Sequence, residues 1–526
     1  MPEARSWQVR WWQSQWQNAT GRWRSATVEQ RRTWRLSAVS AFVGLVVAVA
    51  SVLAAGPWDN GQRKAERARA AGSPGTGGER HGGDDARSAP GAAPVLAPLG
   101  TAAVAPSPDS GDDAVPAPTQ AGLADALEPL LDENGAAGAL GRTGSVSVVD
   151  AATGRQVYGA RADAKAVPAS IIKLATGIAA LSALGPDHRI KTTVVVPEGG
   201  GKGKDKDRIV LVGGGDPTLT ARPAKGPDAP ASLRKLADKT ASALKKSGTD
   251  SVRLGYDTSL YSGPVLHPIG PNENISPVTP LMVDEGRLDD SDHGPAPRSH
   301  DPAADAAEEF ATMLRDRGIA VKGEPRSVKA AKDGKDGKGV RPLATVRSQP
   351  LSALVERALT NSDNDIAEAL ARQTAVAAGE PASFDGAGRA VMARLNKLRL
   401  PLSGARIADG SGLDRADHVS AALLAQVLVR AADPDHPELR PVLTGLPVAG
   451  FTGTLRGRYA QDAVGRGVVR AKTGTLTGVN TLAGAVVDAD GRLLVFAFMT
   501  NGTTDPQGAQ RALDRMASAL ANCGCR

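Results

Sequence analysis

The stretch AVPASIIKLATGIAALSALG, residues 166–185, carries a single charged side chain, Lys173, three positions after Ser170. Its apolar residues recur at the spacing of one helix face, and Pro168 stands just before the first turn, so the sequence predicts a helix throughout. Because its other faces are apolar as well, we expect that helix to be buried. A lysine in such a place is costly unless it is paired or gives up its proton, and Lys173 therefore needs a functional explanation.

The same spacing of serine and lysine occurs twice more, at Ser232 and Lys235 and at Ser242 and Lys245. These two pairs lie in an amphipathic stretch, and we expect them on its solvent side. The expected buried face of that stretch consists of Leu233, Leu236, Ala237, Thr240 and Leu244. Only the copy that begins at Ser170 lies on an apolar helix, where loss of water lowers the pKa of a lysine toward the range of a useful base.

Two further motifs follow along the chain. Ser362, Asp363 and Asn364 stand in a break between a helical stretch, 351–359, and another that starts near Asp365. The only K-T-G of the chain begins at Lys472, on what the pattern predicts to be an exposed strand. Each motif alone can arise by chance, but the three occur in one order and in fitting contexts.

The chemistry explains these residue types. A serine hydroxyl is a weak nucleophile that needs a base, and Lys173, one helical turn away, can take the proton of Ser170. Ser362 can pass a proton to a leaving amine, and Asn364 can orient Lys173 and bind a substrate amide. Lys472 adds a positive charge that keeps Lys173 neutral and attracts an anion.

Substrate binding is assigned to Thr473, Gly474 and Thr475. The hydroxyls of Thr473 and Thr475 can bind a terminal carboxylate, and the backbone N–H groups of Ser170 and Thr475 are the expected donors to a developing oxyanion.

The region from about residue 120 onward alternates short strands and helices. A hairpin is expected over 145–160, three consecutive strands over 468–502 with a tight turn at 488–491, and a helix over 507–520. We therefore predict an α+β fold in which an antiparallel sheet is flanked by helices. Residues 196–340, which include lysine-glycine loops and helices at 231–246 and 303–317, look like an insertion into that domain.

The N-terminal part has a different character. Residues 36–56 hold no charge over 21 positions, which is about the length that crosses ~30 Å of hydrocarbon, and arginines precede them. The sequence predicts a single transmembrane helix with a cytoplasmic N-terminus and a catalytic domain outside the cell. A cleaved signal peptide is the alternative, and the 35-residue leader favours the anchor. Residues 57–119 are predicted to be a disordered linker.

The distribution of charge and the two cysteines bear on which molecules or ions the protein can bind. Of the net charge of +7, the tail 1–35 supplies +5, so nothing favours a nucleic-acid partner. The tryptophans of that tail suit either a membrane interface or a disordered segment. Cys523 and Cys525 are compatible with a disulfide within the chain, a bond between chains or free thiols, and two thiols do not complete a metal site. We expect no metal and no cofactor.

The three motifs S-x-x-K, S-D-N and K-T-G resemble those of the serine penicillin-binding protein and β-lactamase superfamily. The 189 positions from Lys173 to Ser362 make the chain similar to the class C low-molecular-mass penicillin-binding proteins, which carry an insertion there. The stretches LVGGGDPTL (211–219), DGSGLDR (409–415) and FTGTLRGR (451–458) also resemble this class. In the second of them, Asp414 stands where a small polar residue is expected.

This resemblance, which spans about 120–520, implies a transpeptidase-like domain in two parts, 120–195 and 341–526, around the insertion 196–340. It also implies an acyl-enzyme on Ser170, cleavage of D-alanyl-D-alanine termini or cross-links in peptidoglycan stem peptides, and covalent inhibition by β-lactams. Two alternatives stay open: a β-lactamase, although no E-x-x-L-N type element follows Asn364, and a catalytically silent wall-binding protein.

Overall fold

The computed structural model describes residues 117–525 except 132–139, 141–143, 198–206, 224–225, 227, 331–338 and 461–463. The basic tail 1–35, the apolar segment 36–56 and nearly all of the linker 57–119 lie outside the described residues. Within the described part of the chain, no helix is both long and apolar enough to cross a bilayer. The anchor therefore stays a prediction.

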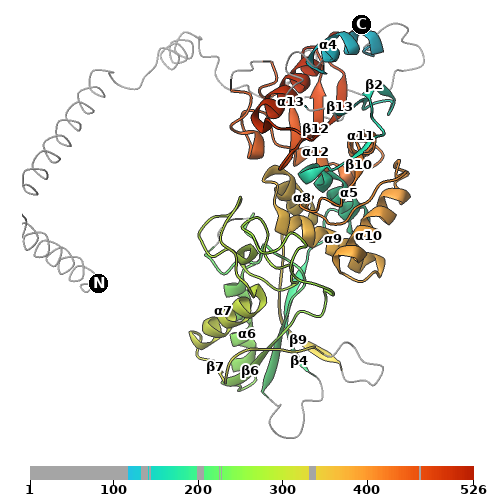
Figure 1. Cartoon of the computed structure of the whole chain (residues 1–526). Helices are drawn as coiled ribbons and strands as arrows, with labels where there is room; N and C mark the ends of the chain where they lie inside the picture. The colour runs from blue at the N-terminus through green and yellow to red at the C-terminus, as the bar shows by residue number, and fades with distance from the viewer. Residues whose placement is uncertain are drawn as a thin grey trace, which may run out of the picture. The chain divides into compact units, whose positions relative to one another are not determined.

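Five antiparallel strands form the main sheet, in the order β11-β12-β13-β1-β2 (Figure 1). Their bounds are β1 Ser145–Asp150, β2 Gln156–Ala160, β11 Arg470–Leu476, β12 Val479–Val487 and β13 Leu493–Asn501. The predicted hairpin and the three predicted C-terminal strands are confirmed. The tight turn between β12 and β13 is closed by the amide of Gly491, which donates to the carbonyl of Asp488 at 3.1 Å.

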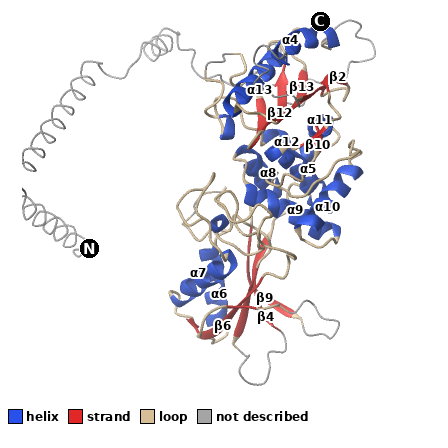
Figure 2. Ribbon diagram, viewed as in Figure 1, coloured by secondary structure: helices blue, strands red, loops and turns tan. Residues whose placement is uncertain are grey.

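Helices cover both faces of this sheet (Figure 2). On β13, Val495, Ala497 and Met499 contribute to one buried cluster, and the alternate residues Phe496 and Phe498 to another, as the two-residue period of a strand requires. The second cluster includes α4 (Gln120–Leu131) and α13 (Pro506–Ala521), and α13 confirms the helix expected over 507–520. The predicted α+β class is borne out.

The first cluster belongs to a helical layer that carries the motifs. Its helices are α5 Lys173–Leu184, α8 Leu351–Thr360, α9 Asn364–Ala378, α10 Phe384–Lys397, α11 Ala421–Ala432 and the short α12 Pro441–Thr444. The helix predicted over 166–185 is only partly correct. Residues 165–166 are strand β3 (Lys165–Ala166), paired with β10 (Val419–Ser420), and a 3-10 turn, η2 (Ala169–Ile172), precedes α5. Ser170 therefore lies on the 3-10 turn.

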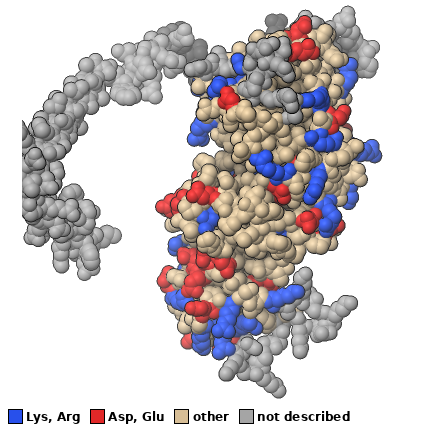
Figure 3. Space-filling model, in the orientation of Figure 1, with Lys and Arg blue, Asp and Glu red and all other residues tan. Residues whose placement is uncertain are grey.

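A second sheet lies between the two halves of the main domain in sequence. Its order is β7-β6-β5-β4-β9, with β8 paired to β6. The strands are β4 Lys191–Pro197, β5 Arg208–Val212, β6 Ser251–Asp257, β7 Ala320–Val321, β8 Arg326–Ser327 and β9 Val340–Arg347. The helices α6 (Leu233–Lys246) and α7 (Pro302–Arg315) pack on it around a separate core. On the face drawn in Figure 3, side chains of both charges are mixed over this region.

Helix α6 tests the two extra serine-lysine pairs. All five residues of its predicted apolar face are buried, and Lys235, Ser242 and Lys245 are exposed as expected. Ser232 corrects the prediction: it is buried as the N-cap, and its hydroxyl accepts the amide of Lys235 at 3.2 Å. Neither pair is a buried site like the one at Ser170.

The C-terminal residues are hydrogen-bonded to the start of the first described helix, α4. Cys523 and Cys525 form a disulfide within the chain, which decides among the three alternatives left by the sequence. The amide of Thr119 donates to the carbonyl of Cys525 at 2.6 Å. The last residues therefore hold the segment that begins α4.

Candidate active site

Ser170 is presented by a turn that the neighbouring sheet holds in place. The preceding residue, Ala169, has a φ of +50°, a left-handed conformation that is costly for a residue with a Cβ. The hydroxyl of Thr481 donates to the carbonyl of Pro168 at 2.8 Å. The side-chain amide of Asn501 bonds both the N–H and the C=O of Val167, at 3.1 and 3.2 Å. These bonds from β12 and β13 stabilise the turn.

Lys173 begins α5 and its side chain is 1% exposed. Its Nζ lies 3.0 Å from the Oγ of Ser170, 2.7 Å from the Oδ1 of Asn364 and 2.5 Å from the carbonyl oxygen of Ser411. The three acceptors come from segments that are far apart in the sequence. The amine is therefore fixed within proton-transfer distance of the Ser170 hydroxyl.

Burial lowers the pKa of Lys173 to about 8. The charges that act on it work in the opposite direction, because the carboxylates of Asp409, Asp363, Glu368 and Asp417 each raise that pKa. Loss of water, more than the charge of Lys472, thus accounts for the lowering that the sequence predicts. Lys173 is therefore more readily available as a neutral base near physiological pH than an exposed lysine, although the protonated form still predominates there.

A second lysine-serine pair faces the first. The Nζ of Lys472 donates to the Oγ of Ser362 at 2.9 Å and to the carbonyl of Thr473 at 2.7 Å. Lys472 is fully buried although β11 is the edge strand, which corrects the expectation of an exposed strand at that position. Burial and the charge of Lys173 hold the pKa of Lys472 well below its ordinary value.

The S-D-N motif lies between two helices, as predicted. Ser362 has a φ of +58°, and the side chain of Asp363 caps α9 by accepting the amide of Ile366 at 3.0 Å. This turn directs Ser362 to Lys472 and Asn364 to Lys173. The Nδ2 of Asn364 also donates to the carbonyl of Asn274 at 2.9 Å, in the inserted region.

Gly474 allows β11 to pack against the turn of Ser170. A Cβ at Gly474 would lie 2.2 Å from the Thr481 hydroxyl and 3.1 Å from the nitrogen of Ser170. Thr475 is exposed, and the hydroxyl of Thr473 donates to that of Thr454 at 2.8 Å. Thr454, in the stretch 451–458, is a residue to which sequence reasoning assigned no role.

These side chains surround one cleft of about 410 Å³. The cleft is lined by Ser170, Ser362, Asn364, Thr473 and Thr475. The buried amines of Lys173 and Lys472 do not line it but are hydrogen-bonded to Ser170 and Ser362, so the structure brings all five predicted catalytic residues together. The inserted region also contributes to the lining, with Asn274, Gly294, Pro295 and two arginines, Arg287 and Arg298. None of these five was predicted, because they lie outside the recognised stretches and residues of these types give no signal in one sequence.

Two buried groups of carboxylates near the cleft have other partners than a metal. Asp409 already accepts five hydrogen bonds and Glu368 two. In the second group, Glu285 is paired with Arg287 and Arg357, and Asp365 with Arg298 at 2.9 Å. In the first group the oxygens of Asp409 are already taken by these donors, and in the second the arginines supply the positive charge that a cation would supply, so neither donor set fits a metal site.

A family model, described as the D-Ala-D-Ala carboxypeptidase 3 (S13) family, matches residues 127–293 and 289–523. The chain belongs to this S13 family. The matched ranges include all three motifs and the inserted region, so the resemblance inferred from the motifs is confirmed.

Other members are similar over most of their length. The chain is 37% identical over 440 residues to a carboxypeptidase DacB of Mycolicibacterium smegmatis, covering 80% of this chain and 90% of that protein. It is 27% identical over 454 residues to a D-alanyl-D-alanine carboxypeptidase of Actinomadura sp., covering 73% and 82%. The crystal structure of penicillin-binding protein 4 of Haemophilus influenzae has the same fold, with a TM-score of 0.59 at 22% identity, covering 76% of this chain and 98% of that one.

Proposed function

We propose that this S13 protein is a serine D-alanyl-D-alanine carboxypeptidase and endopeptidase that acts on peptidoglycan stem peptides through an acyl-enzyme. The observation that carries the proposal is the facing pair of lysine-serine contacts, Lys173 with Ser170 and Lys472 with Ser362, in one cleft. One pair supplies a nucleophile and its base, and the other supplies a proton path and an amine whose protonated form an anionic substrate would stabilise. The names of similar S13 proteins support the same reaction.

In the acylation step, the Oγ of Ser170 attacks the carbonyl carbon of the amide between two D-alanines, and Lys173 takes the hydroxyl proton. A C–O bond forms and the carbonyl oxygen becomes an oxyanion. The backbone N–H groups of Ser170 and Thr475 are the proposed donors to that oxygen. When the intermediate collapses, the C–N bond breaks and the leaving amine takes, through Ser362, the proton that Lys173 had accepted, so Lys173 is neutral again.

Water then attacks the ester carbon, returns a proton through Lys173 and releases the shortened peptide with Ser170 restored. Before the reaction, the terminal carboxylate of the substrate is proposed to bind the hydroxyls of Thr473 and Thr475 near the charge of Lys472. In an endopeptidase reaction, the leaving amine belongs to a cross-linked neighbouring stem instead of free D-alanine.

A β-lactam is expected to enter the same step because its strained amide presents a carbonyl to Ser170. Its leaving nitrogen stays tethered to the acyl group, so the amine does not diffuse away and the ester persists. A β-lactamase would use the same groups but release the ester rapidly. A fluorescent penicillin separates the two: a covalent label that lasts for many minutes supports the peptidase, and rapid turnover contradicts it.

The deciding experiment is the release of D-alanine from a pentapeptide that ends in D-alanyl-D-alanine. The parent is expected to release it, and Ser170→Ala to release none. Ser242→Ala, in the exposed serine-lysine pair of α6, is the matched control and should act like the parent. An inactive parent would favour the silent wall-binding protein, and an active Ser170→Ala would refute the assigned nucleophile.

We also propose that residues 36–56 anchor the protein in the cell membrane with the catalytic domain on the cell-wall side. The uncharged length of this segment and the arginines before it support that orientation. Protease added to intact spheroplasts should digest the catalytic domain and spare the N-terminal tail. Recovery of the full chain in the soluble fraction would contradict the anchor.

A further inference from the structure

The segment 409–414 passes beside Lys173 and is held by a carboxylate on α9. The carbonyl of Ser411 accepts the Nζ of Lys173 at 2.5 Å. On the other side of the same loop, the Oε1 of Glu368 accepts the amides of Gly410 and Ser411, both at 2.9 Å. Glu368 lies one helical turn after Asn364, the side chain of α9 that accepts a hydrogen bond from this lysine.

Asp409 folds the same segment around its own side chain. Its Oδ1 accepts the amide of Gly412 at 2.6 Å. Its Oδ2 accepts the amides of Leu413 and Asp414 at 3.0 and 2.9 Å and the hydroxyl of Ser411 at 2.8 Å. The position of the Ser411 carbonyl thus depends on two buried carboxylates.

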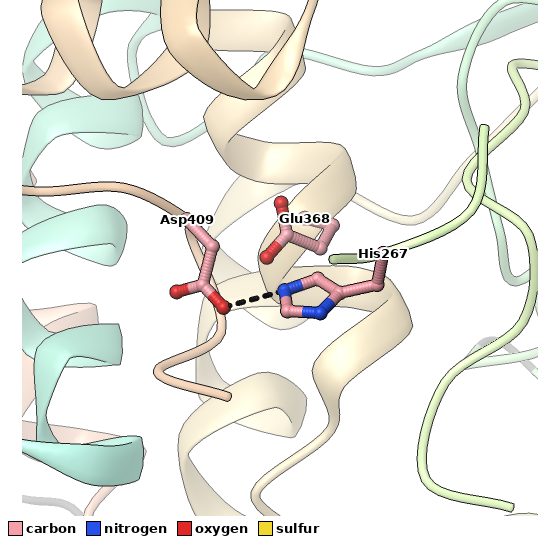
Figure 4. A group of neighbouring side chains, drawn as sticks. All are labelled: His267, Glu368 and Asp409. Carbon is pink, nitrogen blue, oxygen red and sulfur yellow. Dashed lines mark hydrogen bonds and ion pairs between the residues drawn. The ribbon is translucent and has the colours of Figure 1, made fainter. Parts of the chain in front are cut away.

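His267 brings the inserted region into this cluster (Figure 4). Its Nε2 lies 2.8 Å from the Oδ2 of Asp409, and both side chains are fully buried. The Nδ1 of His267 accepts the amide of Ile269 at 3.3 Å, so Nε2 carries the proton that is donated to Asp409. The ring also packs edge-on against Phe384 at 5.2 Å.

We propose that His267, Asp409 and Glu368 are positioning residues for the general base: together they hold the Ser411 carbonyl that fixes the amine of Lys173 beside Ser170. None of the three lines the cleft, so they act through the loop and not on the substrate. This role rests on the proposed function. It also gives the inserted region a part in the chemistry, since His267 is the only member that comes from outside the main domain.

The charges of the cluster also act on Lys173. Among the carboxylates that raise the pKa of Lys173, Asp409 has the largest effect, and Asp363, Glu368 and Asp417 follow. Burial and the charge of Asp409 raise the pKa of Glu368, and His267, the hydrogen bond from Ser411 and Arg372 lower it, which leaves it at about 7. Burial would lower the pKa of His267, but its bond to Asp409 and the charges of Asp409, Glu368 and Asp414 raise it on balance.

The test compares acylation rates for a fluorescent penicillin, with its pre-acylation dissociation constant measured separately. Glu368→Ala is expected to slow the acylation step about 100-fold or more, with little change in that dissociation constant, because Lys173 is misplaced. Glu368→Gln keeps an oxygen for the two amides and should stay within about fivefold of the parent. The pH of its half-maximal rate should move down, because Lys173 loses a neighbour that is negatively charged above its own pKa of about 7 and that raises the pKa of Lys173.

His267 is tested in the same way. His267→Gln can still donate to Asp409 and is expected to acylate within about fivefold of the parent, whereas His267→Phe keeps the packing, loses the donor and should fall about 100-fold. Asp257→Asn is the matched control. The buried carboxylate of Asp257 holds a loop of the inserted region by accepting hydrogen bonds from the amides of Ser259 and Ala330. The Asp257→Asn variant should leave the pH dependence of the acylation rate on the acid side unchanged.

The outcomes separate this role from the proposed function. A parent that is never acylated overturns both. If the parent is acylated, a His267→Phe rate equal to that of the parent overturns the positioning role alone. The positioning role alone is also overturned if Glu368→Gln is acylated as slowly as Glu368→Ala and its rate depends on pH on the acid side as that of the parent does.

Discussion

The α-carbon of Gly474 packs so closely on the turn of the nucleophile that an added Cβ would lie 3.1 Å from the backbone nitrogen of Ser170. The same atom would clash with the Thr481 hydroxyl at 2.2 Å and crowd the carbonyl of Pro168 at 2.8 Å. The edge strand and the turn can keep this contact only if position 474 has no side chain.

We therefore predict that Gly474→Ala slows acylation by penicillin about 100-fold or more, since the strand must move away from Ser170. Gly457→Ala is the matched control, because a Cβ there meets nothing within 4 Å. Rates and melting temperatures of both variants check the prediction. An alanine at 474 that acylates at the parent rate would show that the contact is not needed.

Lys173→Met should abolish acylation almost completely, with a loss of about 1,000-fold or more, because the side chain keeps its bulk but loses the base. Lys245→Met, in an exposed serine-lysine pair, should change nothing. The measurement is the labelling rate with a fluorescent penicillin, and intact mass shows whether Ser170 carries the acyl group. Comparable labelling of the two variants would assign the base elsewhere.

The acylation rate should depend on pH through Lys173, whose pKa is about 8. Only the neutral amine can accept the proton of Ser170. The rate is therefore expected to rise about tenfold per pH unit well below that pKa and to level off above it. A pre-steady-state series from pH 5.5 to 9.5 checks this, and a rate that falls steadily as pH increases would contradict the assigned base.

Thr481→Val should lower the free energy of unfolding by about 1 kcal/mol and also slow acylation, because the carbonyl of Pro168 loses its donor beside Ser170. Thr193→Val removes a comparable hydroxyl contact, with Thr345 at 3.2 Å in the second sheet. That control should show a similar or smaller stability loss and no change in rate. Equal rate losses in both variants would point to a general effect of destabilisation.

The motif residues of the site could be predicted from the sequence because each carries a side chain whose chemistry has a recognisable spacing. Of the three acceptors that fix Lys173, only the carbonyl of Ser411 is not a motif side chain. It lies 238 positions away in the sequence, and any residue type offers a carbonyl. The side chains that support the turn, Thr481 and Asn501, likewise become neighbours of residues 167 and 168 only when the sheet forms.

Fold prediction succeeded where hydrophobic period and turn residues agree, as in the hairpin 145–160 and the strands over 468–502. It was wrong at the start of α5, where periodicity alone extends the helix back to residue 166. The structure has a 3-10 turn there with a left-handed Ala169, which hydrogen bonds from β12 and β13 hold. Contacts between distant segments here determine the local conformation, and a single sequence gives no signal of them.

The two strands that lead into and out of the second sheet, β4 and β9, run side by side in opposite directions. A protein engineer could join them by a short turn and delete everything between, and the remaining chain would still close on itself. The truncated enzyme would then have Asp409 without its imidazole donor and Asn364 without the Asn274 carbonyl. The second-sheet region could therefore be deleted without breaking the path of the chain, but the catalytic domain would lose hydrogen bonds that its active site depends on.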